Sequence, residues 1–505
     1  MDSLSLNTKF LSNEFDDYKS AIQKNEEYNL NDNLYMIEPF SVGYINNFIS
    51  MPNGFYEKIL NELKSIKLSD KSNDLYKFQQ SKDFKLLKKS KTLQHIRSFF
   101  LQSILPWMKE ATGIDLYDNE IDITYSVYKD SDYLLCHDDH LEARRIAFVW
   151  YLVNDDWNEE NGGHLDIIST DESGEPSRVH NSFLPKQNSF VFFKVADNSY
   201  HQVREVKLNT ESTEKARISI NGWFRGPSIK FKDVASIPPP ERLSPVHIEE
   251  ALIHEWISEI YLSDQVVDEI RESFLENSEV QLVDFFNEDK YNELLKCLDS
   301  LEYRMHGPMN VMQTFLAVND KSEFPAIVQE VCRILGSEAI MVLLSDMTGL
   351  NFHGSSQKNK EADESEVERT DSKGEGPSSS KKRKTELSSE VIQVGKLSSI
   401  ELRHWKPGCY SLLRDGDQRY REARLDLFYS VGFPEKTDSK LDCGGFYSYF
   451  AEGEDEELLT IAPCRNALSL VYADDQTMGF MKYITSKFHH SDNLYDFHST
   501  FYEYE

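Results

Sequence analysis

The sequence predicts an α+β protein with two helix-flanked β-barrels in tandem. Pairs of similar segments recur in the same order in the two halves of the chain, which is the signature of an internal repeat. At 505 residues the chain is also too long for one ordinary core, because a domain usually has about 150 residues. A hydrophobic fraction of 39% and an aromatic fraction of 12% are sufficient to build two cores.

The paired segments share residue types and nearly share their spacing. They are 37–49 with 283–295, AFVWYLV (147–153) with LDLFYSV (425–431), Gly162-Gly163 with Gly444-Gly445, and Pro185–Asn188 with Pro463–Asn466. The double glycines differ by 282 positions and the Pro-x-x-Asn segments by 278, so order and spacing are nearly kept. Chance similarity between two unrelated β-rich units is the alternative.

Composition along the chain predicts five regions. Pro238–Pro240 breaks the chain, and the three- and four-residue apolar spacing of 246–262 predicts that a helix begins the next unit. Residues 354–390 have almost no apolar side chains, so burial cannot offset the entropy of ordering them. The predicted regions are a polar tail (1–30), a first barrel (31–237), a helical connector with the start of the second unit (238–353), a disordered insertion (354–390) and a second barrel (391–505).

The charge balance limits the kinds of partner. With 55 Lys and Arg against 86 Asp and Glu, the net charge is −31, which makes direct nucleic-acid binding an unfavourable hypothesis and favours basic protein partners. The longest apolar run, Ile146–Val153, is far shorter than a membrane-spanning helix, so no membrane association is expected. Six cysteines without a CxxC pair are typical of a reduced intracellular protein. The basic run Lys381–Lys384 resembles a nuclear-import signal, which predicts both cytoplasmic and nuclear localisation; a solvated charge run is the alternative.

A metal site is predicted around LLCHDDH (134–140). His137 and Asp139 are two residues apart, and on a strand such side chains share a face. His201, beyond the next long apolar strand, would be the third ligand. Two histidines and one carboxylate hold Fe(II) and leave positions open for other ligands. A surface turn or a core histidine is the alternative for HxD; the nearby His140 and His164 could compete as ligands and are left out of the set.

An anion site is predicted on the strand ARISINGWF (216–224). There Arg217, Ser219 and Asn221 share one strand face, so a barrel would hold the arginine in a polar interior. A buried guanidinium is costly unless it meets an anion, and a dicarboxylate fits it as a two-bond fork. Tyr128 and Tyr151 could donate further hydrogen bonds to a carboxylate. The alternatives are a structural ion pair for the arginine and ordinary core packing for the tyrosines.

These motifs together resemble a known family. LLCHDDxLExRRIAFxxYLV, the double glycine, SYHQVxEV and RxSIxGWFxGPS are similar to the ribosomal-protein prolyl 3-hydroxylases, a group of 2-oxoglutarate- and Fe(II)-dependent oxygenases. The resemblance covers most of the chain outside the N-terminal tail and 354–390. It implies two tandem double-stranded β-helix (jelly-roll) barrels, of which the first is catalytic and the second degenerate. The gap between His201 and Arg217 is longer than in the group, which is consistent with a longer hairpin tip.

The resemblance also implies an activity. It places Fe(II) on His137, Asp139 and His201, and 2-oxoglutarate on Arg217, Tyr128 and Tyr151. The expected reaction uses dioxygen as a second cosubstrate, is supported by L-ascorbate, and 3-hydroxylates a prolyl residue of a small-subunit ribosomal protein at the decoding centre, with an effect on translation.

Comparison of the two halves tests whether the second barrel could hold iron. Aligning the repeats places Asp415 opposite His137, Asp417 opposite Asp139 and Gly479 opposite His201. Glycine has no ligand atom, so the second barrel is expected to serve rigidity, dimerisation or substrate docking.

Two other functions compete with this hypothesis. A non-enzymatic or bifunctional adaptor that senses oxygen or iron could bind partners through the second barrel. A nucleic-acid demethylase would share the iron chemistry, but the charge of −31 and the lack of a basic groove near the motifs argue against it.

Overall fold

The computed structural model divides the chain into two compact units. It describes residues 4–7, 13–141, 143–208, 215–232, 236–317, 323–356, 392–414, 417–435, 443–454, 456–488 and 494–504. Unit 1 is Met1–Val234 with Gly307–Met312 and Thr485–Lys487, and unit 2 is the remainder. The predicted disordered insertion, 354–390, lies outside the described residues from position 357 onwards.

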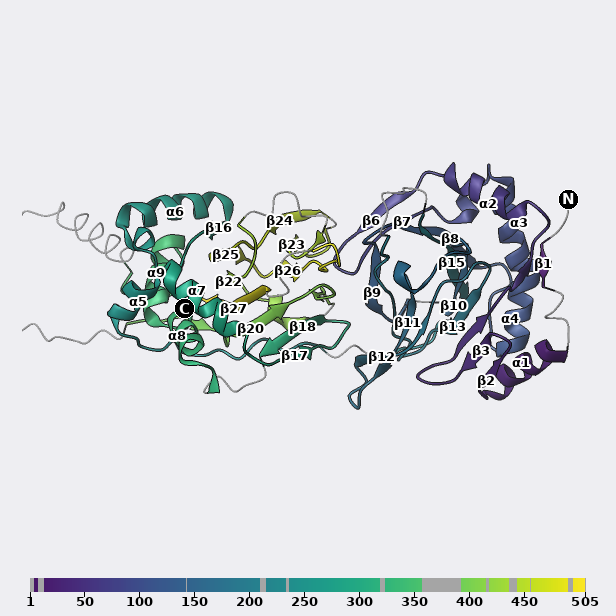
Figure 1. The fold of residues 1–505 in the computed structure, drawn as a ribbon, viewed down its shortest axis with the longest axis horizontal. Helices are drawn as coiled ribbons and strands as arrows, with labels where there is room; N and C mark the ends of the chain where they lie inside the picture. The colour runs from purple at the N-terminus through teal and green to yellow at the C-terminus, as the bar shows by residue number, and fades with distance from the viewer. Residues whose placement is uncertain are drawn as a thin grey trace, which may run out of the picture. The chain divides into compact units, whose positions relative to one another are not determined.

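Four helices lie along one face of the main sheet of unit 1 (Figure 1). Their apolar sides pack with the strand residues Phe148 and Trp150 in one buried cluster. Helix ends follow local chemistry: the Ser90 hydroxyl accepts a hydrogen bond from the Leu93 N–H at 3.1 Å, and Gly113, with φ of 65°, ends the fourth helix. The helices are α1 (Asn13–Lys24), α2 (Phe55–Lys64), α3 (Lys91–Phe99) and α4 (Leu105–Thr112).

The N-terminal region is not the polar tail that composition predicts. It contains β1 (Ser5–Leu6), the helix α1 and β2 (Tyr28–Leu30). Tyr18 and Ile22 of α1 are buried, with 2% and 5% of their surfaces exposed. They are four residues apart and so share one helix face, a pattern that the polar average of the segment hides.

The main sheet of unit 1 has thirteen strands, and all its pairs are antiparallel. Its order is β12-β11-β14-β9-β7-β8-β15-β10-β13-β4-β3-β2, with β6 added at β7. The other strands are β3 (Asn33–Met36), β4 (Val42–Ile45), β5 (Ile49–Ser50, paired with β1), β6 (Ser69–Ser72), β7 (Tyr76–Gln80), β8 (Ile121–Tyr128), β9 (Tyr133–His137), β10 (Arg144–Tyr151), β11 (Leu165–Thr170), β12 (Pro176–Phe183), β13 (Phe190–Lys194), β14 (His201–Val203) and β15 (Arg217–Arg225).

The sheet encloses a second core on the face away from the helices. Leu165 of β11 and Val203 of β14 join Ala147 of β10 and Val191 of β13 in one buried cluster, although these pairs lie in different parts of the strand order. The two parts of the sheet therefore face each other across an interior, as in a jelly roll.

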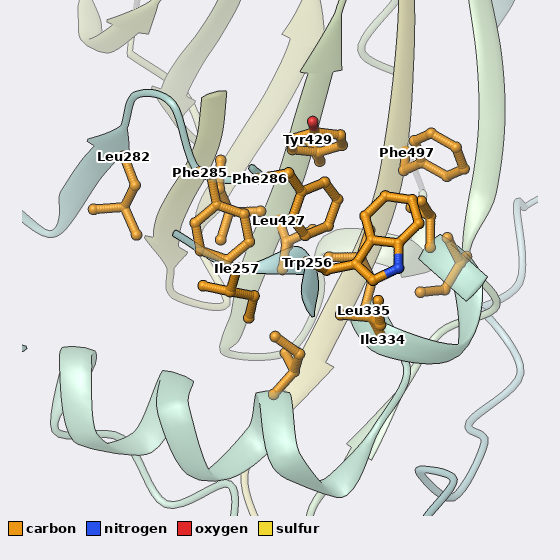
Figure 2. Packing of buried hydrophobic residues seen from close by; sticks show 14 of the residues in the cluster. Trp256, Ile257, Leu282, Phe285, Phe286, Ile334, Leu335, Leu427, Tyr429 and Phe497 are labelled. Atoms are coloured by element: carbon orange, nitrogen blue, oxygen red, sulfur yellow. The ribbon is translucent and has the colours of Figure 1, made fainter. Parts of the chain in front are cut away.

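Unit 2 packs five helices against a nine-stranded sheet. Figure 2 shows Trp256, Phe286 and Tyr429 at the centre of this core, with ring centroids 5.1 Å apart for Trp256 and Phe286 and 4.4 Å apart for Phe286 and Tyr429. The helices are α5 (Glu250–Trp256), α6 (Asp264–Asn277), α7 (Glu288–Leu298), α8 (Ala326–Leu335) and α9 (Glu338–Thr348). The helix predicted over 246–262 is thus shorter than its apolar spacing indicates.

The strands of unit 2 form a large and a small sheet. The large one has the order β16-β25-β22-β27-β20-β18-β17, with β19 at β27 and β21 at β18, and the small one has the order β24-β23-β26. The strands are β16 (Glu279–Leu282), β17 (Tyr303–His306), β18 (Met312–Ala317), β19 (Lys396–Leu397), β20 (Glu401–Trp405), β21 (Tyr410–Ser411), β22 (Arg424–Val431), β23 (Tyr447–Ala451), β24 (Glu457–Ile461), β25 (Ala467–Ala473), β26 (Thr477–Met481) and β27 (Leu494–Tyr502).

One hydrogen-bond arrangement recurs in the two units. In unit 1 the Asn188 side chain accepts from the Ile49 N–H at 3.3 Å and from the Trp150 indole at 3.1 Å. In unit 2 the Asn466 side chain accepts from the Phe286 N–H at 3.1 Å and from the Tyr429 hydroxyl at 2.8 Å.

This arrangement corrects two of the predicted repeats. Trp150 corresponds to Tyr429, so the match of 147–153 with 425–431, which sets Trp150 opposite Phe428, is wrong by one residue. Ile49 corresponds to Phe286, so the match of 37–49 with 283–295, which sets Phe40 opposite Phe286, is wrong by nine residues. Both segments are apolar with a following helix, and this general likeness does not fix a register.

Among the described residues, no helix has both the length and the apolar character needed to span a lipid bilayer.

Candidate metal and cosubstrate site

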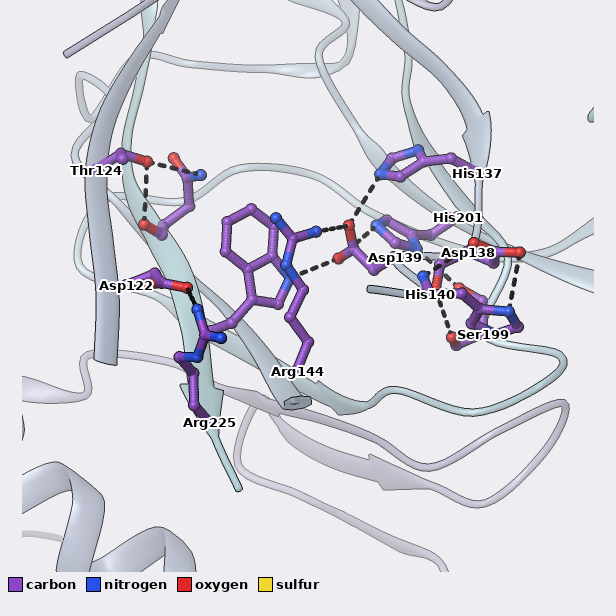
Figure 3. Close-up of polar contacts among 12 residues, drawn as sticks. Asp122, Thr124, His137, Asp138, Asp139, His140, Arg144, Ser199, His201 and Arg225 are labelled. Atoms are coloured by element: carbon purple, nitrogen blue, oxygen red, sulfur yellow. Dashed lines mark hydrogen bonds and ion pairs between the residues drawn. The ribbon is translucent and has the colours of Figure 1, made fainter. Parts of the chain in front are cut away.

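The predicted ligands come together at the open end of the jelly-roll interior. His137 ends β9 and His201 begins β14, and the two are direct partners in the ladder between these strands. One nitrogen of each histidine and one oxygen of Asp139 lie within 4.8 Å of one another. Figure 3 shows the Asp139 carboxylate beside the two rings, joined to both by dashed lines. The distances from Nε2 to the nearer carboxylate oxygen are 3.6 Å for His137 and 3.7 Å for His201.

Each histidine is oriented by the backbone two residues before it. His137 Nδ1 lies 2.8 Å from the Leu135 carbonyl oxygen, and His201 Nδ1 lies 2.8 Å from the Ser199 carbonyl oxygen. A carbonyl oxygen only accepts, so each Nδ1 carries a proton and Nε2 is the ring nitrogen that faces Asp139. Two imidazoles oriented through Nδ1, with Nε2 next to a carboxylate, are a donor set that suits a divalent metal ion.

The backbone conformation that brings the Asp139 carboxylate close to His137 and His201 differs from the one that the sequence spacing predicted. The strand β9 ends at His137, so His137 and Asp139 do not share a strand face, and this part of the prediction is wrong. Asp139 has φ of 63°, a left-handed conformation that redirects its carboxylate toward the rings. Aspartate tolerates this conformation better than most residues, because it can form local polar contacts.

Burial lowers the pKa of His201, whereas neighbouring charges lower the pKa of Asp139. Burial lowers the pKa of His201 to about 4, with a contribution from the neighbouring His137, so the ring is neutral at physiological pH. For Asp139, burial would raise the pKa, but His201, His137, Arg144 and a hydrogen bond from Trp223 together lower it. The site therefore keeps an ionised carboxylate beside the neutral ring of His201.

Arg217 lies deep in the same interior, with 2% of its surface exposed. Its Nε donates to the Gly163 carbonyl oxygen at 2.7 Å, and its Nη2 donates to the Tyr151 hydroxyl at 3.3 Å. Its guanidinium carbon is 4.9 Å from the centre of the Tyr128 ring and 5.0 Å from that of Tyr151. No carboxylate of the described residues pairs with it, which disfavours the structural ion pair and fits an anionic ligand.

The two predicted tyrosines frame this arginine from neighbouring strands. Tyr128 pairs with Arg217 across β8 and β15, and Phe78 stacks on its ring at 4.7 Å. Burial raises the pKa of both phenols, partly offset by the charge of Arg217, so both remain protonated hydrogen-bond donors at neutral pH. Tyr128 lines the cavity described below, whereas Tyr151 contributes through its contact with Arg217.

A cavity of about 490 Å³ connects the metal-ligand candidates with Arg217. Its lining includes all three metal-ligand candidates and Arg217, together with Ser219 and Asn221. The volume is in the range of small-molecule sites. The alternation predicted for β15 is present, because Ile220 faces the helices while Arg217, Ser219 and Asn221 face the cavity.

The competing histidines do not belong to the cluster. The His140 ring stacks on Phe231 at 4.1 Å, and its Nε2 lies 2.5 Å from the Ala196 carbonyl oxygen. His164 Nε2 lies 2.7 Å from a carboxylate oxygen of Glu159.

Three residues of the site carried no predicted role. Trp223 and Arg144 both contact the carboxylate of Asp139, and Gly163 supports Arg217. Trp223 was visible as one of the polar-face positions of its strand, six residues after Arg217. Arg144 and Gly163 contact residues in other strands and loops, so these contacts cannot be predicted from the spacing of residues within one segment.

Comparison with known proteins defines the class. A family model for the 2OG-Fe(II) oxygenase superfamily matches residues 123–225, which contain every ligand candidate of the site. A second model, oxoglutarate and iron-dependent oxygenase degradation C-term, matches residues 249–505, about half of the chain. The chain is therefore a member of the 2-oxoglutarate- and Fe(II)-dependent oxygenases.

Similar sequences narrow the class to one family. A prolyl 3-hydroxylase of Xenopus laevis is 37% identical over 92% of this chain and 87% of its own length. One of Mus musculus is 36% identical over 89% and 85%, and prolyl 3-hydroxylase sudestada1 of Drosophila melanogaster is 29% identical over 84% and 76%. The chain belongs to this family of prolyl 3-hydroxylases. Among solved structures, a Pseudomonas putida prolyl-4-hydroxylase is 17% identical over 37% of this chain and 92% of its own, with a TM-score of 0.30.

Proposed function

We propose that this protein is a 2-oxoglutarate- and Fe(II)-dependent prolyl hydroxylase that holds iron on His137, Asp139 and His201 and binds 2-oxoglutarate at Arg217. One observation carries the proposal: a two-histidine, one-carboxylate cluster lines one cavity with a buried guanidinium that pairs with no carboxylate among the described residues. This arrangement does not favour the adaptor alternative, which needs neither a complete ligand set nor a cosubstrate anchor.

The residues of the chain have separable tasks in this reaction. Iron and 2-oxoglutarate, when bound, supply the oxidising power by which dioxygen hydroxylates an unactivated C–H bond, with succinate and carbon dioxide as products. The Leu135 and Ser199 carbonyls hold the histidine rings so that Nε2 faces the metal position. Arg217 would pair with the carboxylate of 2-oxoglutarate remote from the metal, assisted by the hydroxyls of Tyr128 and Tyr151. The apolar walls, such as Phe78, Ala147 and Phe193, exclude water.

The proposed substrate is a prolyl residue of a small-subunit ribosomal protein at the decoding centre, hydroxylated at C3, with an effect on translation. The curated relatives named prolyl 3-hydroxylase support the position of hydroxylation. The net charge of −31 supports a basic partner, since complementary charge accelerates encounter and favours correct pairing. We further propose that L-ascorbate sustains turnover by keeping the iron reduced, and that the protein works in both cytoplasm and nucleus. The import motif Lys381–Lys384 lies outside the described residues.

Mass spectrometry of a hydroxylated peptide tests the proposal. A proline-containing peptide from the decoding-centre ribosomal protein is incubated with the full chain, Fe(II), 2-oxoglutarate and L-ascorbate. We expect a gain of one oxygen on proline that is lost without iron and with His137→Ala. Succinate formation without peptide oxidation would refute the substrate and keep the oxygenase. Substantial turnover by folded, iron-loaded His137→Ala would refute the ligand set.

For unit 2 we propose a degenerate second barrel, with the boundaries 31–237 for the catalytic barrel, 238–353 for the connector and 391–505 for the second barrel. Strand register supports this proposal. His201 pairs with Ile167, five residues after Gly162, and Gly479 pairs with Tyr449, five residues after Gly444. At Gly479 an added Cβ would lie 2.7 Å from the Tyr449 ring, so no ligating side chain fits.

Two further positions agree with the loss of iron chemistry. Trp150 and Tyr429 are equivalent, because they bond to the corresponding residues Asn188 and Asn466. Trp150 pairs with Ile220, and Tyr429 pairs with Phe497. Arg217 lies three residues before Ile220 and Leu494 lies three residues before Phe497, so these two residues correspond. Asp417, aligned with Asp139, is bound by the guanidinium of Arg419 at 2.6 Å. Asp415, aligned with His137, lies outside the described residues. We propose that this unit serves rigidity, homodimerisation or docking of the substrate protein.

A further inference from the structure

The carboxylate of Asp139 is held by two side chains that the reaction described above does not use. The Trp223 indole N–H donates to Oδ2 at 2.8 Å, and Nη1 of Arg144 donates to Oδ1 at 3.3 Å. Figure 3 shows Arg144 extended toward Asp139 on the side opposite the histidines. Both residues line the cavity.

Trp223 and Arg144 form one supporting unit. The guanidinium carbon of Arg144 lies 3.5 Å from the centre of the Trp223 ring, a close stacking contact. They come from neighbouring strands of the sheet, since Arg144 begins β10 and Trp223 lies near the end of β15, which pairs with β10. The support is therefore anchored in regular structure, although the residue that it supports is not.

Asp139 needs such support because it lies beyond the end of β9 in a left-handed conformation. A strand ladder does not orient it, and an aspartate side chain has two free torsions. The two donors take one carboxylate oxygen each and leave the remaining lone pairs facing His137 and His201. An indole N–H can only donate, so its bond fixes Oδ2 as an unprotonated acceptor without adding a positive charge beside a metal cation.

We infer that Trp223 is a positioning residue for the metal centre: its indole N–H, with Arg144 stacked on the ring, fixes the rotamer in which Asp139 serves as a ligand. This inference rests on the proposed ligand set of His137, Asp139 and His201. On this account β15 has two functions, because it carries the cosubstrate anchor Arg217 at one end and the metal-ligand support Trp223 six residues further on.

The test compares Fe(II) affinity in Trp223→Phe and in a matched control. Trp223→Phe removes the N–H donor and keeps an aromatic ring for Arg144. Trp150→Phe removes an indole N–H that donates at 3.1 Å to Asn188, in the same unit but on the helix-facing side of the sheet. Metal-free full-length protein is titrated with Fe(II) without oxygen, and the absorption spectrum of the Co(II) form is recorded as a signature of ligand geometry.

We expect Trp223→Phe to weaken Fe(II) binding about 10- to 100-fold and to change the Co(II) spectrum, with a small change in melting temperature. Trp150→Phe should lower the melting temperature and leave both metal readouts at the wild-type values. Wild-type affinity and spectrum in Trp223→Phe would overturn the inference, and so would an equal loss of affinity in Trp150→Phe, which would indicate general loosening. If Trp223→Phe does not fold, benzothienylalanine incorporated at position 223 removes the N–H at nearly constant volume and carries the same expectation.

The wild type separates this inference from the proposed function. Wild-type protein that binds no Fe(II), or binding that survives His137→Ala, would refute the ligand set and the role of Trp223 with it. Iron binding that depends on His137 but not on the indole N–H would refute only the role of Trp223.

Discussion

The interiors of the two units use polar residues for opposite purposes. In unit 1, Arg217 pairs with no carboxylate in the part of the chain that the structure describes, and it lines a cavity with room for a ligand. In unit 2, Arg403 is bound by Asp496 through two hydrogen bonds of 2.8 and 2.7 Å, and the Tyr447 hydroxyl donates to the same carboxylate. Arg403 is thus paired within the chain, whereas Arg217 lines a cavity in which we propose that it binds an anion.

The largest expected effect comes from giving unit 1 the residue that unit 2 has at the corresponding position. His201→Gly removes one of the three proposed protein ligands, so we expect iron-dependent turnover of 2-oxoglutarate to be abolished. Succinate formation and Fe(II) binding measure the effect, with Gln202→Ala as a control at the next position of the strand. Turnover near the wild-type rate would show that His201 is not a ligand.

The ion pair of unit 2 offers the next largest effect, and it acts on stability. Asp496→Ala leaves a buried guanidinium without its partner, which costs about 3–5 kcal/mol in the free energy of unfolding. Denaturant unfolding followed separately for each unit should show the loss in unit 2. The double variant Arg403→Met, Asp496→Leu should recover most of it, because an apolar pair of similar volume avoids the buried charge. No recovery would mean that the network does more than balance charge.

Arg217→Leu sharpens the comparison at the proposed cosubstrate anchor, since Leu494 occupies the corresponding place in unit 2. Loss of a two-bond guanidinium–carboxylate contact worth about 3 kcal/mol predicts a rise in the Kd for 2-oxoglutarate of about 100-fold. Calorimetric titration of the metal-loaded protein measures it, and Fe(II) affinity should be unchanged. An unchanged Kd for 2-oxoglutarate would contradict the anchor.

The double glycines provide a matched pair of variants. Gly163 and Gly445 have φ of 69° and 76°, so alanine introduces the same backbone strain of about 1 kcal/mol at either place. At Gly163 the new Cβ would lie 2.7 Å from Cδ of Arg217, whereas at Gly445 its nearest contact would be 3.5 Å away on Ile484. We expect Gly163→Ala to weaken 2-oxoglutarate binding about 10-fold by displacing Arg217, and Gly445→Ala to leave it unchanged. Equal effects on binding would remove Gly163 from the site.

The smallest effect concerns pH. Burial raises the pKa of Asp132 in unit 1 to about 6, although the Lys129 N–H donates to it at 2.8 Å. The folded state therefore holds this proton more tightly than the unfolded chain, and the contribution to stability present below pH 4 is lost as the pH rises to 6. Asp132→Asn removes that loss, so we expect a gain on the order of 1 kcal/mol at pH 8 and none at pH 4. Unfolding curves at both pH values measure the difference, and a gain of equal size at both would contradict the assignment.

The sequence predicted which side chains gather around the cavity better than it predicted their geometry. The alternation in β15 and the identities of His137, Asp139, His201 and Arg217 follow from residue type and spacing, and the structure gathers all four around one cavity. Spacing could not show that β9 stops at His137, because a left-handed aspartate leaves no periodic signal. The support by Trp223 and Arg144 depends on which strands are neighbours, and strand order is a property of the whole sheet. Helix α1 was missed because its buried face consists of few apolar residues in a polar segment.

The side-chain hydrogen bonds of Asn188 and Asn466 also bear on how the chain folds as it is synthesised. Asn188 satisfies backbone groups 139 residues earlier in the chain, and Asn466 does the same across 180 residues. Until Asn188 and Asn466 leave the ribosome, the segments near Ile49 and Phe286 lack these hydrogen bonds. The helices that follow these two segments, α2 and α7, are synthesised before the asparagines. Contacts that close long loops form late and slow folding. Each unit should therefore acquire protease resistance in one step, after Asn188 or Asn466 has emerged from the ribosome. In a nascent chain halted shortly before position 466, unit 1 should resist protease and unit 2 should be cleaved.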